Sequence, residues 1–447
     1  MSIFKECDIR GVYGQELDDA TGLRLGRALS THLAGREVVV GGDLRPSTPA
    51  LKGALIAGLI RGGCRVIDIG TVPTPALYYA KRALGAHGTV MVTASHNPAR
   101  YNGFKLMIGD RPVTPALLEG LARAMEAGTF VSGEGSVRLA TILAAYADAL
   151  VNAFPGLSRR HVVVDAGNGS LWEVAPAVLR RAGQEVTPLF CTPDGTFPHR
   201  DPNPAVPAHL EALRARVRAV GADLGVAYDG DGDRVVFVDA RGAVQPADRV
   251  LVLFARHALA ERPGGAIVYD LKASSVVAEE TVAAGGRPLM EKSGHAFIKA
   301  RLLDEGAVLG GEVSGHYFFG AIGGDDALYA TLYYLRVLDA LGLSAAEALA
   351  TVPAYPITPD IRLPCPPAEA DALLDELAQG LRDAPIDRLD GVRVAFADGW
   401  ALVRRSVTEP VITLRCEAHT TEGLARIQER VRAASPRLAH LLCEAGW

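Results

Sequence analysis

One pattern of apolar residues, helix and glycine occurs three times along this chain and limits the folds that it can adopt. Each copy has a short apolar strand, an aspartate and a serine, a helical stretch, a glycine and a second strand; the copies begin at Val38, Val162 and Ile267. Strands that alternate with amphipathic helices become buried by those helices in α/β sheets. Because the period is that of a domain, we expect three related α/β domains and not a solenoid.

Each copy also carries a polar loop. This loop comes after the second or third strand of the copy and lies between two apolar segments. These loops cover residues 93–102, 229–234 and 312–316. If the three copies share a fold, the loops occupy equivalent corners and face one common site.

The last part of the chain has a different pattern. Proline becomes frequent from about Ala354, and we expect a smaller α+β domain after it, with helices near 368–382 and 421–434 and strands at 392–396, 401–404 and 411–417. The predicted domain boundaries are 1–140, 141–243, 244–355 and 356–447.

Length and composition are those of a globular protein with several domains. A chain of 447 residues is too long for one core, and 46 basic against 51 acidic residues give a net charge of −5 without single-sign blocks. This excludes a nucleic-acid or membrane-surface footprint. Six separated cysteines without a Cys-x-x-Cys motif, and an N-terminus without a signal segment, predict reduced thiols and a cytoplasmic protein.

The loop Asp229-Gly230-Asp231-Gly232-Asp233-Arg234 is the strongest candidate for a metal site. It differs from an EF-hand, since Arg234 and Ala240 stand where glycine and glutamate are needed. Three like charges on one tight loop repel each other unless a cation neutralises them. The alternative is a solvated acidic turn. The loop alone leaves Mg²⁺ and Ca²⁺ open, whereas a phosphate partner favours Mg²⁺.

Ser95, in the run Thr93-Ala94-Ser95-His96-Asn97-Pro98, is the candidate carrier of a phosphoryl group. A phosphorylated serine needs a hard cation beside it, and Lys105 on the next strand adds a positive charge or a proton carrier. The alternative is an ordinary serine in a turn. The chain has no Gly-x-Ser-x-Gly elbow, so an esterase nucleophile is not expected.

Two further segments carry candidate binding groups. Glu312, Ser314 and His316 alternate along one side of an extended loop and suit hydrogen bonds to neighbouring sugar hydroxyls, although a structural turn with a surface histidine stays possible. His295 has a weaker signal and could equally be a packed core residue. The segment from Arg404 to Pro410 offers guanidinium and hydroxyl donors that match a phosphate monoester; a charged surface hairpin is its alternative.

With these motifs in order, the chain resembles the α-D-phosphohexomutase superfamily, and within it the phosphomannomutase/phosphoglucomutase branch. The resemblance covers nearly the whole length and rests on DIRG from Asp8, TASHNP around Ser95, DGDGDR from Asp229, GEVSGH from Glu312 and RRSVTEP from Arg404. It implies three related α/β domains with mixed sheets and a C-terminal α+β domain like the TATA-binding protein, around a central cleft.

The resemblance also implies roles for single residues. Ser95 would be the phosphoserine, and its phosphoryl oxygen with Asp229, Asp231 and Asp233 would hold Mg²⁺. Glu312 and Ser314 would bind sugar hydroxyls, and His316 would lie near the reacting hydroxyl. The non-reacting phosphate would contact Arg404, Ser406 and Thr408. Further cleft residues would be Arg10, Lys105 and Arg234 for catalysis, and Lys272 and His295 for substrate binding. Cys7 and Val407 depart from the expected pattern.

The implied reaction interconverts hexose 1-phosphate and hexose 6-phosphate, of mannose, glucose or both, through phosphoserine and a hexose 1,6-bisphosphate that also serves as activator. A phosphoglucosamine mutase is the alternative within the fold, although GEVSGH replaces the GEQSGH common in that branch. A metal-dependent sugar phosphatase and a non-catalytic phosphosugar-binding protein are alternatives from other classes. Whether the chain is a monomer or a homodimer stays open.

Overall fold

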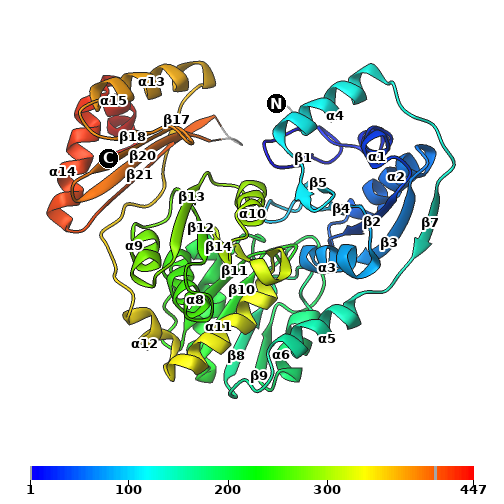
Figure 1. Cartoon of the computed structure of the whole chain (residues 1–447), viewed down its shortest axis with the longest axis horizontal. Coiled ribbons are helices and arrows are strands. Elements are labelled where there is room, and N and C mark those ends of the chain that lie inside the picture. Colours follow the sequence, from blue (N-terminus) through cyan, green and yellow to red (C-terminus); the bar gives the residue numbers. More distant parts are fainter. Residues whose placement is uncertain (1–2, 407–409, 447) are drawn as a thin grey trace.

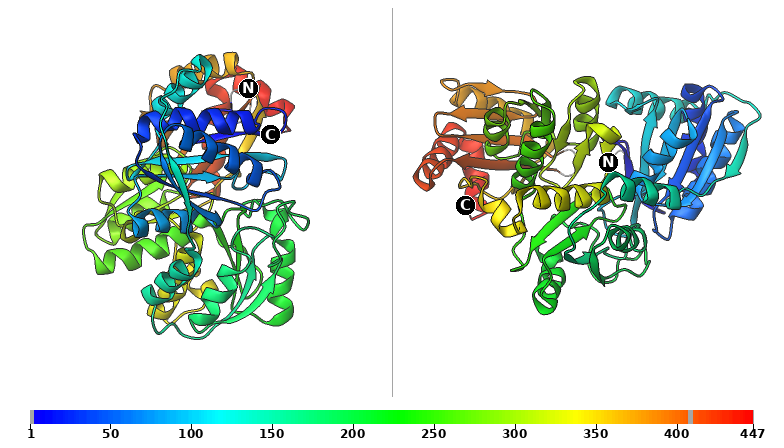
Figure 2. Two further views of the ribbon diagram at one scale, coloured as in Figure 1. Left: turned by 90° about the vertical axis from the view of Figure 1, so that its right-hand side faces the viewer. Right: turned by 60° about the horizontal axis from the view of Figure 1, so that its bottom comes forward.

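The structure is a computed structural model that describes residues 3–406 and 410–446. Within these residues the strands form four sheets, each packed against helices (Figure 1). The first and the last sheet lie on opposite sides of the molecule, with the other two between them (Figures 1 and 2). This confirms the predicted α/β fold, with three related domains of mixed sheets and a smaller α+β domain.

The first domain has the largest sheet. Its strands are β1 (Ile9–Val12), β2 (Glu37–Gly42), β3 (Arg65–Thr71), β4 (Gly88–Val92), β5 (Tyr101–Ile108), β6 (Arg111–Pro112) and β7 (Ser136–Leu139). Its helices are α1 (Asp19–Leu33), α2 (Thr48–Arg61), α3 (Thr74–Leu84) and α4 (Pro115–Ala127). The strand order is β1-β5-β4-β2-β3-β7, with β6 paired to β5.

The second and third domains repeat the central part of this arrangement. The second contains α5 (Leu143–Ala153), β8 (His161–Asp165), α6 (Val174–Arg181), β9 (Glu185–Leu189), α7 (Glu211–Val220), β10 (Leu224–Tyr228) and β11 (Val235–Asp239). The third contains α8 (Ala247–Glu261), β12 (Ala266–Asp270), α9 (Val276–Ala283), β13 (Arg287–Glu291), α10 (His295–Asp304), β14 (Leu309–Gly311), β15 (Tyr317–Phe319), β16 (Gly324–Asp325), α11 (Ala327–Leu341) and α12 (Ala345–Ala350).

The three sheets share one topology. A buried first strand (β2, β8 or β12) pairs in parallel with the strand after the next helix, β3, β9 or β13. On its other side it pairs in parallel with β4, β10 or β14, which then pairs antiparallel with β5, β11 or β15. The three polar loops therefore follow topologically equivalent strands, β4, β10 and β14, in the sheets of the three domains.

The C-terminal domain is an antiparallel sheet covered by helices. Its elements are β17 (Ile361–Pro364), α13 (Pro367–Gly380), β18 (Ile386–Asp387), β19 (Val392–Phe396), β20 (Gly399–Arg405), β21 (Val411–Ala418), α14 (Thr421–Ala434) and α15 (Pro436–Glu444). Trp400 and Leu402 pack on Leu271 of the third domain. No helix in the described part of the chain has the length and apolar composition needed to cross a lipid bilayer.

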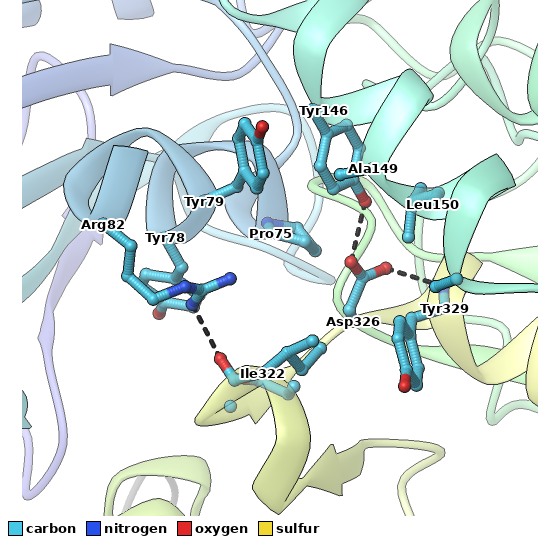
Figure 3. Close-up of a pocket in the computed structure, with 13 residues that line it drawn as sticks. Pro75, Tyr78, Tyr79, Arg82, Tyr146, Ala149, Leu150, Ile322, Asp326 and Tyr329 are labelled. Carbon is cyan, nitrogen blue, oxygen red and sulfur yellow. Dashed lines mark hydrogen bonds between the residues drawn. The ribbon is translucent and has the colours of Figure 1, made fainter. Parts of the chain in front are cut away.

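Helices of the first three domains meet around a cavity of about 80 Å³ (Figure 3). Arg82 on α3 donates to the Ile322 carbonyl over 2.7 Å, and the Tyr146 hydroxyl on α5 donates to Asp326 over 2.9 Å. Asp326 also caps α11 by accepting from the backbone of Leu328 and Tyr329. Burial raises the pKa of the Asp326 carboxyl to about 7, against the lowering effect of these hydrogen bonds.

Asp326 should make stability depend on pH. Its ordinary pKa is near 4, so its contribution is present below about pH 4 and is lost as the pH rises to about 7. Asp326→Asn keeps a capping oxygen but cannot ionise. Between pH 5 and pH 7 the variant should therefore gain up to about 3 kcal/mol of unfolding free energy relative to the wild type. Denaturant unfolding at both pH values measures this, and an equal difference at the two would contradict it.

Close contact between α1 and α2 gives a second prediction. A Cβ at Gly58 would lie 2.2 Å from the Leu23 carbonyl oxygen, whereas one at Gly53 of the same helix would meet nothing within 4 Å. Gly58→Ala should destabilise the protein by about 1–3 kcal/mol, and Gly53→Ala should stabilise it by about 0.5–1 kcal/mol. Thermal melting of the two variants must move in opposite directions; a shift of both in one direction would disprove the packing argument.

Candidate functional site

The structure brings the three polar loops together. The Ser95 hydroxyl, on the loop between β4 and β5, donates to Asp229 Oδ2 on the loop between β10 and β11 over 2.8 Å. Arg234 on that second loop donates from Nε to His316 Nε2, on the loop between β14 and β15, over 2.8 Å. One group of contacts thus joins segments of three domains.

Ser95 is fully buried and has a left-handed backbone, with φ of 50°. Its N–H donates to Thr93 Oγ1 over 2.8 Å. The neighbouring His96 ring lies 3.5 Å from the Ser95 hydroxyl. Burial, together with Arg234 and Arg10, lowers the pKa of His96 well below its ordinary value, so this imidazole stays neutral near pH 7.

The acidic loop is a cluster of buried carboxylates. Oxygens of Asp229, Asp231 and Asp233 all lie within 4.8 Å of one another. Asp229 Oδ1 accepts from three backbone N–H groups of its own loop, which leaves Oδ2 to Ser95. Asp231 Oδ1 and Asp233 Oδ1 are buried and accept no hydrogen bond from any residue that the structure describes. Such unsatisfied carboxylate oxygens fit a hard divalent cation such as Mg²⁺.

The ammonium group of Lys105, on β5, forms ion pairs with this cluster. Its ammonium donates to Asp231 Oδ2 over 2.8 Å and to Asp233 Oδ2. Burial alone would lower the pKa of Lys105, but Asp231 and Asp233 raise it above its ordinary value. Burial and the other two carboxylates raise the pKa of Asp229 well above its ordinary value. One ammonium therefore does not remove the repulsion within the cluster.

Arg10 on β1 reaches the same loop as Ser95 from the other side. Its Nε donates to Asp8 over 2.8 Å, and its Nη1 donates to the Ala94 carbonyl and to Asn97 Oδ1 over 3.2 and 2.6 Å. The guanidinium is thereby held beside the residue that precedes Ser95.

The third loop carries hydrogen-bonding groups that the protein does not saturate. Glu312 Oε1 accepts from the Gly294 N–H over 2.7 Å, and burial raises the pKa of the Glu312 carboxyl. The Ser314 hydroxyl oxygen is buried and has no hydrogen-bond partner among residues 3–406 and 410–446. The His295 ring stacks 6.0 Å from the His316 ring, and burial lowers the pKa of His295 well below its ordinary value.

The structure adds two residues that no sequence motif indicated. Asp325 on β16 places Oδ2 3.1 Å from His316 Nδ1, and Lys299 on α10 places Nζ 3.7 Å from Asp325 Oδ1. Burial would raise the pKa of Asp325, but His316 and Lys299 lower it overall. In the sequence, the pair Asp325-Asp326 stands before an apolar helical segment. This pattern indicates a helix cap, and it does not indicate a partner for His316.

The predicted phosphate-binding Arg404 of the C-terminal domain and the predicted substrate-binding Lys272 of the third domain make their ion pairs away from this group. Arg404 Nε donates to Asp390 over 2.7 Å, and Lys272 lies 3.5 Å from Asp360. Within the described residues, neither contacts the three loops. The Ser406 N–H donates to the Val411 carbonyl, and Thr408 lies outside the described residues.

Comparison with known proteins defines the class as that of four-domain phosphosugar mutases. Profiles of the phosphoglucomutase/phosphomannomutase family match in order: alpha/beta/alpha domains I, II and III at residues 1–132, 144–242 and 246–355, and the C-terminal domain at 361–434. The chain belongs to the phosphoglucomutase/phosphomannomutase family.

Individual relatives agree with this assignment. A phosphomannomutase/phosphoglucomutase of Pseudomonas putida is 40% identical over 438 residues, which cover 96% of this chain and 95% of the relative. A probable phosphoglucosamine mutase of Methanothermobacter thermautotrophicus is 37% identical and covers 96% of this chain and 97% of its own length. The crystal structure of a family protein from Burkholderia thailandensis superposes with a TM-score of 0.90 at 37% identity, over 97% of this chain and 96% of that one.

Metal binding gives a direct test of the acidic cluster. Mg²⁺ at about 100 times its dissociation constant should stabilise the wild type by about 2.7 kcal/mol. Asp231→Asn should lose most of this stabilisation because it removes a carboxylate that has a free buried oxygen. Asp223→Asn, an exposed position of the same domain, is the control. Thermal melting with Mg²⁺ or with EDTA measures the effect, and equal Mg²⁺ responses in all three proteins would refute the site.

Proposed function

We propose that this protein is a phosphohexomutase that interconverts hexose 1-phosphate and hexose 6-phosphate of mannose, glucose or both. The observation that carries the proposal is the buried Ser95 hydroxyl, whose oxygen lies 2.8 Å from Asp229 Oδ2 in a cluster of three buried aspartates that could hold a metal ion. Membership of the phosphoglucomutase/phosphomannomutase family supports the same reaction.

In the proposed reaction, phosphorylated Ser95 gives its phosphoryl group to the free hydroxyl of the hexose phosphate. The P–O bond to Ser95 Oγ breaks, a new P–O bond to the sugar forms, and the sugar hydroxyl loses its proton. Asp229, Asp231 and Asp233 would hold Mg²⁺, which offsets the charge of the phosphoryl group when bound. Lys105 and Arg10 contribute fixed positive charge on the two sides of the Ser95 loop.

His316 is the proposed acceptor of the hydroxyl proton. Its Nε2 accepts a hydrogen bond from Arg234, so the lone pair of this nitrogen points toward Arg234, and Glu312 Oε2 lies 3.9 Å from the same nitrogen. A sugar hydroxyl that displaces Arg234 would meet that lone pair. Arg234 would then be free to pair with the substrate.

Sugar recognition falls to Glu312 and Ser314, whose free hydrogen-bonding capacity suits the O3 and O4 hydroxyls. Glucose and mannose differ at C2, so such contacts would accept both. We assign the non-reacting phosphate to Arg404, Ser406 and Thr408. Lys272 and His295 are the further substrate-binding residues of this proposal. The hexose 1,6-bisphosphate would turn over between two transfers, which requires the C-terminal domain to move.

Two alternatives are weaker. The relative named probable phosphoglucosamine mutase is 37% identical, below the 40% of the relative from Pseudomonas putida. Parallel assays with glucose 1-phosphate, mannose 1-phosphate and glucosamine 6-phosphate decide between the substrates. A sugar phosphatase would release inorganic phosphate, whereas the relatives from Pseudomonas putida and Neisseria gonorrhoeae are named as mutases. Hexose 1,6-bisphosphate as activator, a cytoplasmic location and a monomer or homodimer complete the proposal.

Ser95→Ala tests the nucleophile. The variant should lose the single added phosphate seen by intact-mass measurement of the wild type, and turnover should fall by about 10⁴-fold or more. Ser132→Ala, at an exposed serine of the same domain, should keep both the phosphate and the activity. Retention of the phosphate and of near-normal turnover in Ser95→Ala would disprove the assignment.

A further inference from the structure

Arg45, which follows β2 in the first domain, is an arginine without any exposed surface. It makes five side-chain hydrogen bonds, to Asp43 Oδ2 (2.9 Å) and to the carbonyls of Pro98 (2.7 Å), Tyr101 (3.0 Å), Ser95 (2.8 Å) and Asn97 (2.6 Å). Four of these bonds go to the loop that carries Ser95. Because a guanidinium is planar and rigid, this set of bonds determines the path of the loop.

Asp43 holds the same loop at a second point. Its Oδ2 accepts from Thr93 Oγ1 over 2.7 Å, and Thr93 Oγ1 accepts from the Ser95 N–H over 2.8 Å. The N–H and the carbonyl of Ser95 are therefore both held by the Asp43–Arg45 pair, directly or through Thr93. This matters because a non-glycine residue with φ of 50° costs about 1–2 kcal/mol and needs such support.

The second domain closes over this pair. The Phe197 ring lies 5.1 Å from the Arg45 guanidinium, on its face. A Cβ at Gly195 would lie 1.9 Å from the Leu44 carbonyl oxygen, and one at Gly230 would lie 2.6 Å from the Ser95 carbonyl oxygen. The Ser95 loop and the acidic loop are thus in backbone contact at Gly230. The backbone conformation of Ser95 therefore sets the distance from its hydroxyl to Asp229.

The second and third domains also have an aspartate at the end of the first strand that is linked to the polar loop, through an arginine in the second domain and directly in the third. Asp165, at the end of β8, pairs with Arg200, which donates to the Tyr228 carbonyl just before the acidic loop over 2.7 Å. Asp270, at the end of β12, accepts from the Val313 N–H of the third loop over 3.3 Å. Each repeat therefore attaches its polar loop to the aspartate after its first strand.

We propose that Arg45, with Asp43, is a positioning residue that holds Ser95 in its left-handed conformation and so directs the hydroxyl at the acidic cluster. The inference rests on the proposed function of Ser95. Within the described part of the chain, the Arg45 side chain donates hydrogen bonds only to Asp43 and to backbone carbonyls, so it acts on phosphoryl transfer through Ser95 and not by contact with the transferred group. Loss of this support should slow transfer while leaving the sugar-binding loop intact.

The experiment compares kcat and KM of the wild type, Arg45→Lys and Arg45→Ala, and the rate at which hexose 1,6-bisphosphate phosphorylates Ser95. In both variants kcat and the phosphorylation rate should fall about 10²-fold, with KM within about twofold, because misplacement of a reacting group has this effect. Added guanidinium ion should partly restore Arg45→Ala. Phe197→Leu, a milder change on the face of the same guanidinium, should lower kcat several-fold.

Arg160→Lys is the matched control, since Arg160 pairs with Asp339 away from the three loops; its kcat should equal that of the wild type. Wild-type kcat in Arg45→Lys would overturn the proposal, as would a loss of kcat in Arg45→Ala that guanidinium does not restore. A wild type without turnover would contradict the proposed function instead. In that case a crystal structure of Arg45→Lys still decides, since the proposal requires Ser95 to leave the left-handed region.

Discussion

Repulsion among three buried carboxylates is the constraint on which this structure depends. Asp229, Asp231 and Asp233 have almost no exposed surface, so water cannot screen their charges. Lys105 pairs with Asp231, the Arg234 guanidinium lies 4.0 Å from Asp229 Oδ2, and the Ser95 hydroxyl of another domain donates to the same Asp229 oxygen. A divalent cation at this cluster would reduce the repulsion among the carboxylates. A phosphoryl group on Ser95 would add negative charge, so it would strengthen the need for that cation.

The triplicated fold explains how such a cluster can be built. Each sheet places a polar loop after the same strand, and each loop is attached to the aspartate that ends the first strand: Asp43, Asp165 or Asp270. Packing of α3, α5 and α11 around one shared core then holds the three domains together. The C-terminal domain contacts the third domain through a smaller apolar group at Leu271 and Trp400, and this small contact is compatible with the domain movement proposed above.

Much of the fold could be predicted from the sequence, because strands, helices and polar loops are local patterns. The predicted strand at 392–396 and helix at 421–434 match β19 and α14. The edge strand β7 was not predicted because it has only four residues, all of them exposed, and β17 and α15 were also not predicted. Arg45 and Asp325 were missed for another reason: the contacts of Arg45 with the Ser95 loop and of Asp325 with His316 and Lys299 depend on how the chain folds, which local sequence patterns do not show.

The buried environment of Ser95 also bears on which phosphoryl reaction fits. A phosphoserine that reacts with water would lose its phosphoryl group and end a mutase cycle, so the nucleophile must be shielded until a sugar hydroxyl arrives. The cavity at the domain junction is lined mainly by α3, α5 and α11, and Ser95 is not among its lining residues (Figure 3). Arg10 contacts the Ser95 loop, and Arg234 and Glu312 lie on the two loops that meet it. All three carry charge or hydrogen-bonding groups that a phosphosugar can engage.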